Sequence, residues 1–264
     1  MSDFERSLKN VKNIIFGLDR TVWRWNELNS GAKDTIQELK TKGKNIFYVT
    51  NNSLLTRQEM AKKLSNMGLK TETDHIISSS FTAAQYFQSN DIGRVYCLGE
   101  QGLVDELDAQ HIENSEDARA VVVGLDRNAT YWKIAKAAER VADGASLYTL
   151  GLGYQFQAGD RTLPGSRVLW EAVKQTADIE EATHLGKPSD TMISAVKDAF
   201  PIVPERTLVV GDSIHADVVF GNKMGVKTGL VLGGRDNKED LEDISGLEVP
   251  NFVFESIERL LVKI

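Results

Sequence analysis

Cysteine, proline and metal-spaced histidine are scarce in this sequence. Cys97 is the single cysteine among 264 residues, which excludes an intrachain disulfide and a cysteine-based zinc site. Five prolines and no low-complexity tract argue against long disordered linkers. The four histidines show no metal-ligand spacing. The remaining composition is that of a globular chain with room for one large domain or two smaller ones.

Excess positive charge and long apolar runs are missing as well. The formal net charge is -7, so we expect no nucleic-acid partner and no anionic membrane surface. No run of 18 apolar residues and no apolar N-terminal signal segment occurs, so we expect no membrane span and a cytoplasmic protein. The charge still permits a small anionic ligand in one locally basic pocket.

Short apolar runs alternate with amphipathic stretches along the whole chain. The clearest run, residues 11–18, ends abruptly in the polar turn 19–21. Further strands are expected at 44–50, 94–98, 119–125, 146–150, 206–210, 226–232 and 252–254. Strands that alternate with helical stretches predict an α/β fold with a doubly wound parallel sheet. A glycine-rich loop is expected over residues 151–165.

Polar clusters follow several of these predicted strands. They comprise residues 19–21, residues 50–53, residues 211–213 with Asp217, and Lys187. In a parallel sheet the carboxyl ends of the strands share one edge, where ligands bind. Carboxylates suit a hard cation, whereas lysine, hydroxyl and backbone N–H groups suit an oxyanion. The clusters together therefore predict a Mg²⁺-dependent phosphate site.

Each cluster also has a purely structural interpretation. Asn51 and Ser53 are common helix caps, and Asp212 follows a glycine as in many turns. Lys187 and Arg20 fit solvated loop positions equally well. The occurrence of four such clusters in this order favours the phosphate site over four independent local roles.

With these residues in place, the chain resembles the haloacid dehalogenase superfamily of phosphatases. The segments that carry the resemblance are, in order, FGLDRTVW, VTNNS, GKPS and VVGDSIHADVVFGNKMG. In detail the chain is similar to the 4-nitrophenylphosphatase and sugar-phosphatase branch, which includes pyridoxal phosphatase and phosphoglycolate phosphatase. The resemblance implies a Rossmann-like core domain, residues 1–90 and 182–264, and an inserted α/β class IIA cap domain, residues 91–181.

The first motif departs from the pattern of that superfamily. The usual motif is Asp-x-Asp-Gly-Thr, in which the first aspartate attacks phosphorus and the second acts as general acid and base. The resemblance places Gly17 at the nucleophile position, Asp19 at the acid/base position and Arg20 at the usual glycine, and it retains Thr21. The catalytic nucleophile is therefore expected to be missing.

The other motifs match the superfamily more closely. The resemblance assigns phosphate binding to Thr50, Asn51 and Lys187. It assigns the Mg²⁺ to Asp212 and the backbone carbonyl of Asp19. It gives Asp217 a supporting role at the same metal. Loss of one carboxylate ligand at position 17 predicts a weakened Mg²⁺ site.

The cap is expected to choose the ligand. By resemblance, the substrate loop of the cap aligns with the segment that contains Gly151, Gly153 and Tyr154. Class IIA caps exclude bulky substrates, so the expected partner is a small phosphorylated metabolite. These caps also tend to pair, which leaves a homodimer through the cap open.

Three hypotheses about function stay open. The first is a pseudophosphatase, which binds a small phosphate monoester but hydrolyses it poorly because Gly17 cannot form a phosphoenzyme. The second is an active Mg²⁺-dependent phosphomonoesterase that uses Asp19 with a water or a displaced nucleophile. The third is a structural or regulatory dimer partner. Whether the protein is an enzyme therefore stays open, as does the origin of Gly17, by natural change or by engineering.

Overall fold

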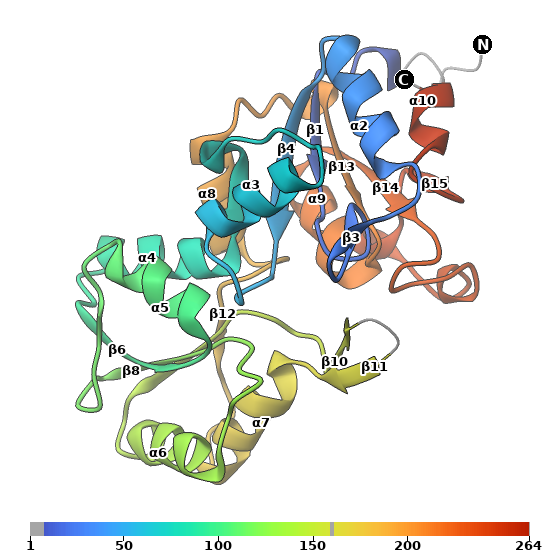
Figure 1. Ribbon diagram of the computed structural model, residues 1–264. Helices are drawn as coiled ribbons and strands as arrows, with labels where there is room; N and C mark the ends of the chain where they lie inside the picture. The colour runs from blue at the N-terminus through green and yellow to red at the C-terminus, as the bar shows by residue number, and fades with distance from the viewer. Residues whose placement is uncertain (1–7, 159–160, 264) are drawn as a thin grey trace. The chain divides into compact units, whose positions relative to one another are not determined.

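The computed structural model describes residues 8–158 and 161–263, and the chain separates into two compact units (Figure 1). The first unit holds the chain up to Thr50, the segment Ala61–Ile76 and the chain from Ile193 onward. The second unit holds Asn51–Met60 and Ile77–Met192. The predicted domain boundaries, at 90/91 and 181/182, stay a prediction.

A parallel sheet forms the centre of the first unit. Its strand order is β15-β14-β13-β1-β4-β5, and every pair from β15 to β4 is parallel. The strands are β1 (Asn13–Phe16), β4 (Asn45–Thr50), β5 (Ile76–Ser78), β13 (Thr207–Gly211), β14 (Lys227–Val231) and β15 (Phe252–Phe254). All residues of β1 and β13 are buried, as expected for central strands covered on both faces. A short antiparallel hairpin, β2 (Trp23–Arg24) and β3 (Glu27–Leu28), follows β1.

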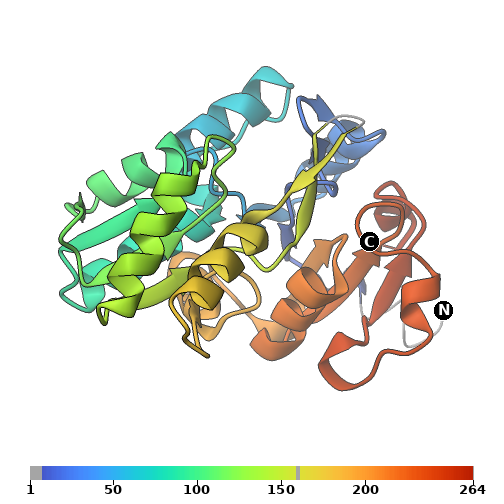
Figure 2. The ribbon, with the colours of Figure 1, turned by 90° about the horizontal axis from the view of Figure 1, so that it is seen from below.

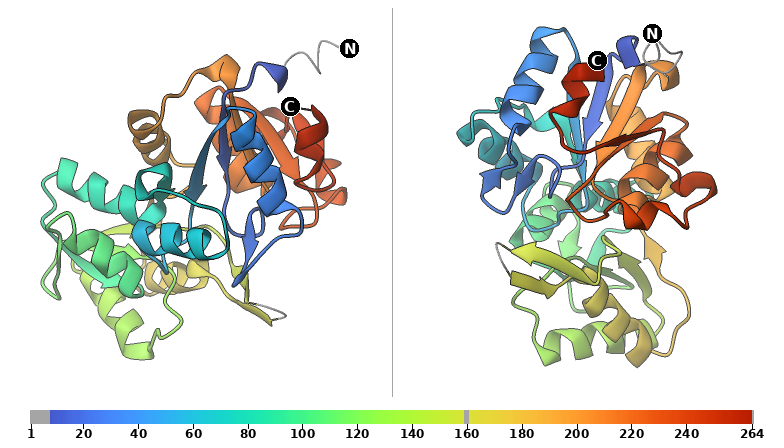
Figure 3. Two further views of the ribbon diagram at one scale, coloured as in Figure 1. Left: turned by 45° about the horizontal axis from the view of Figure 1, so that its top comes forward. Right: turned by 90° about the vertical axis from the view of Figure 1, so that its right-hand side faces the viewer.

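Helices flank this sheet. Helix α2 (Ala32–Thr41) contacts β4 and α10 (Arg259–Lys263), whereas α9 (Val219–Met224) contacts β14 (Figure 3). A π-helical turn, η3 (Ile214–Val218), leads directly into α9. Helices α3 (Arg57–Asn66) and α8 (Asp190–Ala199) run across the boundaries between the units. Single 3-10 turns are η1 (Thr73–His75), η2 (Pro204–Arg206), η4 (Glu239–Leu241) and η5 (Gly246–Glu248).

The second unit has its own parallel sheet, in the order β12-β9-β8-β6-β7 (Figure 2). Its strands are β6 (Arg94–Leu98), β7 (Glu113–Asn114), β8 (Ala120–Val123), β9 (Ser146–Thr149) and β12 (Thr183–His184). Its helices are α4 (Ser79–Ser89), α5 (Gln101–Asp108), α6 (Tyr131–Ala142) and α7 (Ser166–Thr176). One apolar core joins α4 and α5 to the sheet, and a second core joins α6 and α7 to it. The sheet is therefore buried on both faces.

The predicted α/β class with parallel sheets is confirmed, but three local features were not predicted. The hairpin β10 (Gln155–Ala158) and β11 (Arg161–Pro164) lies inside the expected glycine-rich loop. Its residues are partly or fully exposed, so no buried apolar run marked it as a strand. The short β2–β3 hairpin and the π-helical turn η3 also carry no periodic signal. Among the described residues, no helix combines the length and apolar character needed to cross a bilayer.

Candidate active site

The turn after β1 places the residues of the first motif. The Gly17 amide donates to the Val210 carbonyl at 2.8 Å and so extends the pairing of β1 with β13. Three residues later, the chain turns at Arg20, whose φ of 62° lies in the left-handed region. The Arg20 amide closes the turn by donating to the Trp23 carbonyl at 2.6 Å. A glycine adopts this conformation freely, whereas an arginine adopts it at a cost.

Two side chains hold the carboxylate of Asp19 in one orientation. Trp23 Nε1 donates to Asp19 Oδ1 at 2.9 Å, and Thr50 Oγ1 donates to Asp19 Oδ2 at 3.1 Å. Thr50 is buried at the carboxyl end of β4, whereas Asp19 is exposed. The structure thus brings together two of the residues that the sequence analysis selected, Asp19 and Thr50.

The space beside Gly17 faces a buried carboxylate. A Cβ atom built on Gly17 would lie 3.3 Å from both Asp217 Oδ1 and Thr21 Oγ1. Asp217 Oδ2 accepts a hydrogen bond from the Ser213 amide at 3.2 Å. Gly17, the first residue of the motif, therefore has no side chain at the point where one would contact the Asp217 carboxylate.

Asp212 is buried and its two carboxylate oxygens have different partners. Thr21 Oγ1 donates to Asp212 Oδ1 at 3.2 Å, and the Arg235 amide donates to Asp212 Oδ2 at 2.7 Å. The loop that carries Arg235 follows β14 and was not selected from the sequence. Its signal was the pair Gly233-Gly234 after a predicted strand.

Two glycines allow the backbone to approach these carboxylates closely. A Cβ on Gly234 would lie 2.3 Å from Asp212 Cβ, and a Cβ on Gly211 would lie 2.0 Å from Asp217 Cγ. Both distances are far too short for any side chain. Gly211 and Gly234 are therefore required by packing, whereas a side chain at position 17 would need Asp217 and Thr21 to shift only by a few tenths of an ångström.

Cationic side chains gather around the same carboxylates. Burial lowers the pKa of Arg20 from its ordinary value, the neighbouring Asp212 raises it, and Arg235 and Arg24 lower it. Arg24 Nη2 donates to the Gly233 carbonyl at 3.1 Å, which ties the turn after β1 to the loop after β14. This gathering was not predicted, because neither Arg24 nor Arg235 directly follows a strand that the sequence predicts.

Lys63 adds a fourth cation on the side of Asp19. Its ammonium lies 4.5 Å from the centre of the Trp23 ring, and Lys63 Nζ donates to the Trp25 carbonyl at 2.6 Å. Burial lowers the pKa of Lys63, and the charge of Asp19 raises it. The sequence did not predict a role for Lys63 at the site, because this residue does not follow a strand.

The second unit brings the other two predicted phosphate ligands together. Asn51 Nδ2 donates to the Lys187 carbonyl at 3.0 Å, and the Lys187 amide donates to Asn51 Oδ1 at 2.6 Å. The amide of Asn51 thus pairs with both backbone polar groups of Lys187. Asn51 follows Thr50 directly in the chain, so the VTNNS motif continues from the first unit into the second.

His184 also holds the turn that carries Lys187. Its Nε2 lies 3.1 Å from the Lys187 carbonyl oxygen, and its Nδ1 lies 3.1 Å from both the carbonyl and the hydroxyl oxygen of Thr149. Burial lowers the pKa of His184, whereas the two carbonyl contacts raise it. No pattern in the sequence indicated a role for this histidine.

Helix α7 fixes the backbone of the predicted substrate loop. Ser166 Oγ and Trp170 Nε1 donate to the Gly151 carbonyl at 3.2 and 3.0 Å. The Gly165 amide donates to the Tyr154 carbonyl at 2.8 Å. The Tyr154 side chain is 54% exposed, so the loop has a fixed backbone and a free aromatic face.

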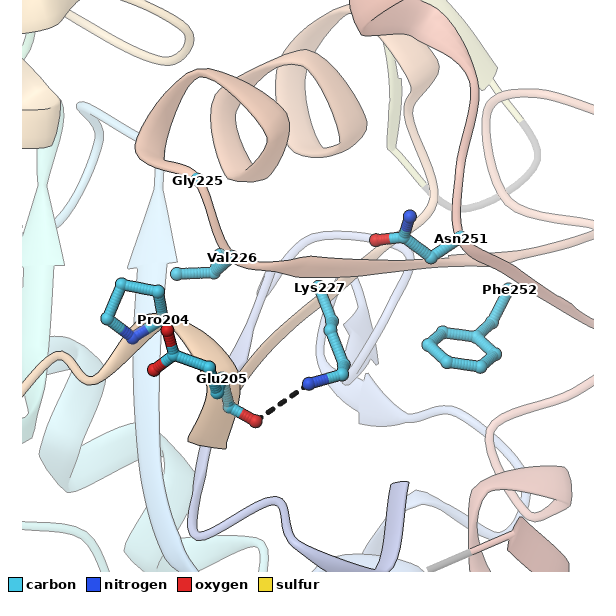
Figure 4. Close-up of a pocket in the computed structure, with 7 residues that line it drawn as sticks. All are labelled: Pro204, Glu205, Gly225, Val226, Lys227, Asn251 and Phe252. Atoms are coloured by element: carbon cyan, nitrogen blue, oxygen red, sulfur yellow. Dashed lines mark hydrogen bonds between the residues drawn. The ribbon is translucent and has the colours of Figure 1, made fainter. Parts of the chain in front are cut away.

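A cavity lies at the other end of the first sheet. It measures about 520 Å³ and lies beside Lys227 and Phe252, the first residues of β14 and β15 (Figure 4). Lys227 Nζ donates to the Glu205 carbonyl at 2.7 Å. Ligands of open α/β sheets bind at the carboxyl ends of the strands, so this cavity does not mark the active site.

Matches to family models and to curated relatives identify the family of this chain. A model described as haloacid dehalogenase-like hydrolase matches residues 14–113, and a second one, HAD-hydrolase-like, matches residues 184–260. The sugar-phosphatase AraL of Bacillus subtilis is 31% identical and covers 93% of this chain and 90% of its own length. Glycerol-3-phosphate phosphatase of Gallus gallus is 31% identical, with 96% of this chain and 92% of the relative covered.

Solved structures agree with these matches. The 4-nitrophenylphosphatase from Thermotoga maritima superposes with a TM-score of 0.88 at 26% identity and covers 96% of this chain and 97% of its own. The resemblance seen in the motifs FGLDRTVW, VTNNS, GKPS and VVGDS is thus confirmed over nearly the whole chain. The chain belongs to the haloacid dehalogenase-like hydrolase family, in the class IIA branch of sugar phosphatases, phosphoglycolate phosphatases and 4-nitrophenylphosphatases.

Proposed function

We propose that this protein binds a small phosphate monoester and hydrolyses it poorly, because Gly17 stands where the family's nucleophile lies. One observation carries the proposal. Position 17 adjoins the Asp217 carboxylate and the Thr21 hydroxyl, yet glycine offers no group that can attack phosphorus. A covalent phosphoenzyme at this position is therefore impossible.

Asp19 is poorly suited to replace the missing nucleophile. It follows position 17 by two residues, which is about 6 to 7 Å along an extended chain. Both oxygens of its carboxylate already accept hydrogen bonds, from Trp23 and Thr50. A misplacement of about 1 Å can cost roughly 100-fold in rate. Removing the covalent nucleophile from another hydrolase cost roughly 10⁶-fold.

The phosphate-binding half of the proposal rests on retained residues. Thr50, Asn51 and Lys187 would bind the phosphoryl group as the family pattern implies. The charge of Lys187 and the hydroxyl of Thr50 favour an oxyanion. The neighbouring cations Arg20 and Lys63 favour binding of an anion at the carboxyl ends of β1 and β4 in the first unit.

A divalent cation fits this edge, although with few ligands. In the described part of the chain, no three His, Cys, Asp or Glu side chains are grouped closely enough to hold a metal ion. Mg²⁺ often binds through one or two carboxylates, waters and the phosphate of the substrate. Asp212 and the Asp19 carbonyl would hold it and Asp217 would support it. When bound, the ion would neutralise charge on the phosphoryl group.

An active phosphomonoesterase is the second candidate, favoured by the fixed geometry of Asp19. In this case Asp19 takes a proton from a water, the water oxygen forms the new bond to phosphorus, and the ester oxygen leaves as the alcohol after it gains a proton. The phosphatase names of the relatives support this candidate as much as the first. It requires that Asp212→Ala or Lys187→Ala abolish turnover.

Hydrolysis of 4-nitrophenyl phosphate separates the two candidates. We expect negligible turnover by the native protein with Mg²⁺ and clear turnover by Gly17→Asp. Gly17→Asn is the matched control, because it adds a side chain of the same size without a nucleophilic carboxylate. Turnover by the native protein at rates typical of enzymes, about 1 to 10³ s⁻¹, would contradict the first candidate.

The same variant tests the position itself. The added carboxylate would lie close to that of Asp217, and two neighbouring carboxylates repel one another. We therefore expect Gly17→Asp to unfold at a lower temperature than the native protein in chelator and to be stabilised by Mg²⁺ more than Gly17→Asn is. Equal responses of the two variants to Mg²⁺ would show that position 17 does not face a cation site.

A further inference from the structure

Arg20 occupies a position where its backbone is disfavoured. Its φ of 62° suits glycine, and a non-glycine residue in this region costs free energy that the surroundings must offset. It lies between Asp19 and Thr21, which both contact other residues of the site. The chain thus holds an arginine in a disfavoured conformation at a point where its charge interacts with those of Asp212 and Asp19.

The charges around Arg20 do not depend on a metal for their balance. Four cations and four carboxylates lie around the carboxyl ends of β1 and β13 in the first unit. They are Arg20, Arg24, Lys63 and Arg235 against Asp19, Asp212, Asp217 and Asp236, whose amide donates to the Asp212 carbonyl at 3.0 Å. If all are ionised, these charges balance before any divalent cation binds.

The guanidinium of Arg20 is available for a ligand. It is partly buried beside Asp212 and Asp19, and within residues 8–158 and 161–263 it forms no salt bridge. Arg24 and Arg235 also lack salt bridges in that part of the chain. The charges of Arg235 and Arg24 lower the pKa of Arg20, and an oxyanion beside the Arg20 guanidinium would offset that repulsion.

We infer, resting on the proposed phosphate binding, that Arg20 supplies the positive charge for which the family uses a metal ion, so that phosphate binds here without a divalent cation. The charge of Arg20 offsets the negative charges of Asp212 and Asp19 in the free protein. In the complex, its guanidinium donates hydrogen bonds to the oxyanion. The first motif then differs from the family pattern at two positions whose effects compensate one another. Gly17 removes a cation ligand, and Arg20 supplies a cation that is part of the chain.

Calorimetric titration with inorganic phosphate tests this inference on the full chain. We expect the native protein to bind phosphate in chelator, without added Mg²⁺. Arg20→Asn should weaken binding in chelator by about ten- to a hundredfold, the value of a charged hydrogen bond. Asparagine tolerates the left-handed backbone, so this variant should remain folded. Arg20→Lys, which keeps the charge, should retain most of the affinity.

Two controls separate the inference from general charge effects and from the proposed function. Lys12→Asn removes the same charge from an exposed residue that precedes β1, at the other end of that strand, and should leave affinity unchanged. Phosphate binding that requires Mg²⁺, or equal binding by native protein and Arg20→Asn in chelator, would overturn the role of Arg20 and leave the proposed function intact. Binding in neither condition would overturn the proposed function itself.

Discussion

At the scale of single residues, Asn51 pairs with the backbone of Lys187 through both atoms of its side-chain amide. We expect Asn51→Asp to lose stability by about 1 to 3 kcal/mol near neutral pH, because a carboxylate oxygen would face the Lys187 carbonyl with no proton to donate. Phosphate affinity should fall with it. Urea unfolding and phosphate titration measure both effects.

The neighbouring residue supplies a matched control for this substitution. Asn52 Oδ1 accepts from the Leu54 amide at 3.0 Å, and a carboxylate at position 52 keeps that bond. Asn52→Asp should therefore lose less stability than Asn51→Asp does. A loss of equal size in both variants would show that added negative charge, and not the contact with Lys187, is responsible.

The sequence predicted the carboxylates of the site better than its cations. Asp19 and Asp212 each follow a buried apolar run, which marks a strand end by pattern alone. Arg235 follows a loop whose path depends on Gly234 passing close to Asp212. The periodicity of apolar residues does not indicate such a contact. The position of Arg235 could therefore be seen only in the structure.

At the scale of secondary-structure elements, α7 anchors the loop of residues 151–154. We expect Trp170→Phe to lower stability by about 1 kcal/mol, because the buried Gly151 carbonyl loses its indole donor and keeps only the Ser166 hydroxyl. The loop should also open more often. Hydrogen exchange at the amides of Gly165 and Arg167, which bond to this loop, should become faster.

An exposed tryptophan of the same unit provides the comparison. Trp132, near the start of α6, is 77% exposed, so Trp132→Phe should change neither the stability nor the exchange of these amides. Unchanged exchange in Trp170→Phe would mean that the loop does not depend on α7.

The elements differ in how far the sequence could predict them. Buried parallel strands such as β8, with the sequence AVVV, are apolar throughout and were predicted from that alone. The hairpin of β10 and β11 pairs through its backbone while its side chains remain exposed or partly exposed. Strands that pair through their backbones without burying side chains show no apolar pattern. The sequence therefore predicts a loop where this hairpin lies.

At the scale of the whole molecule, protons bound on unfolding determine how stability changes with pH. Burial lowers the pKa of His184 from its ordinary value of 6.5, so the unfolded chain binds a proton at a pH where the folded protein does not. This contribution to stability is complete above pH 6.5 and is lost as the pH falls through the lower, folded pKa.

We therefore expect the native protein to lose more unfolding free energy between neutral and mildly acidic pH than His184→Gln does. Urea unfolding at several pH values measures the difference. His111→Gln, at an exposed histidine, should follow the native curve. If the curves of His184→Gln and the native protein are parallel, the histidine does not contribute to the acid sensitivity of the fold.

The three glycines beside the carboxylates also bear on how this chain can change over generations. Positions 211 and 234 admit no side chain, whereas position 17 admits one if Asp217 and Thr21 shift by a few tenths of an ångström. A glycine codon that ends in a pyrimidine becomes an aspartate codon by one base change. Where the codon for Gly17 ends in a pyrimidine, the gene is one base change from a candidate nucleophile at position 17, and a selection for growth on a phosphate ester should recover that change.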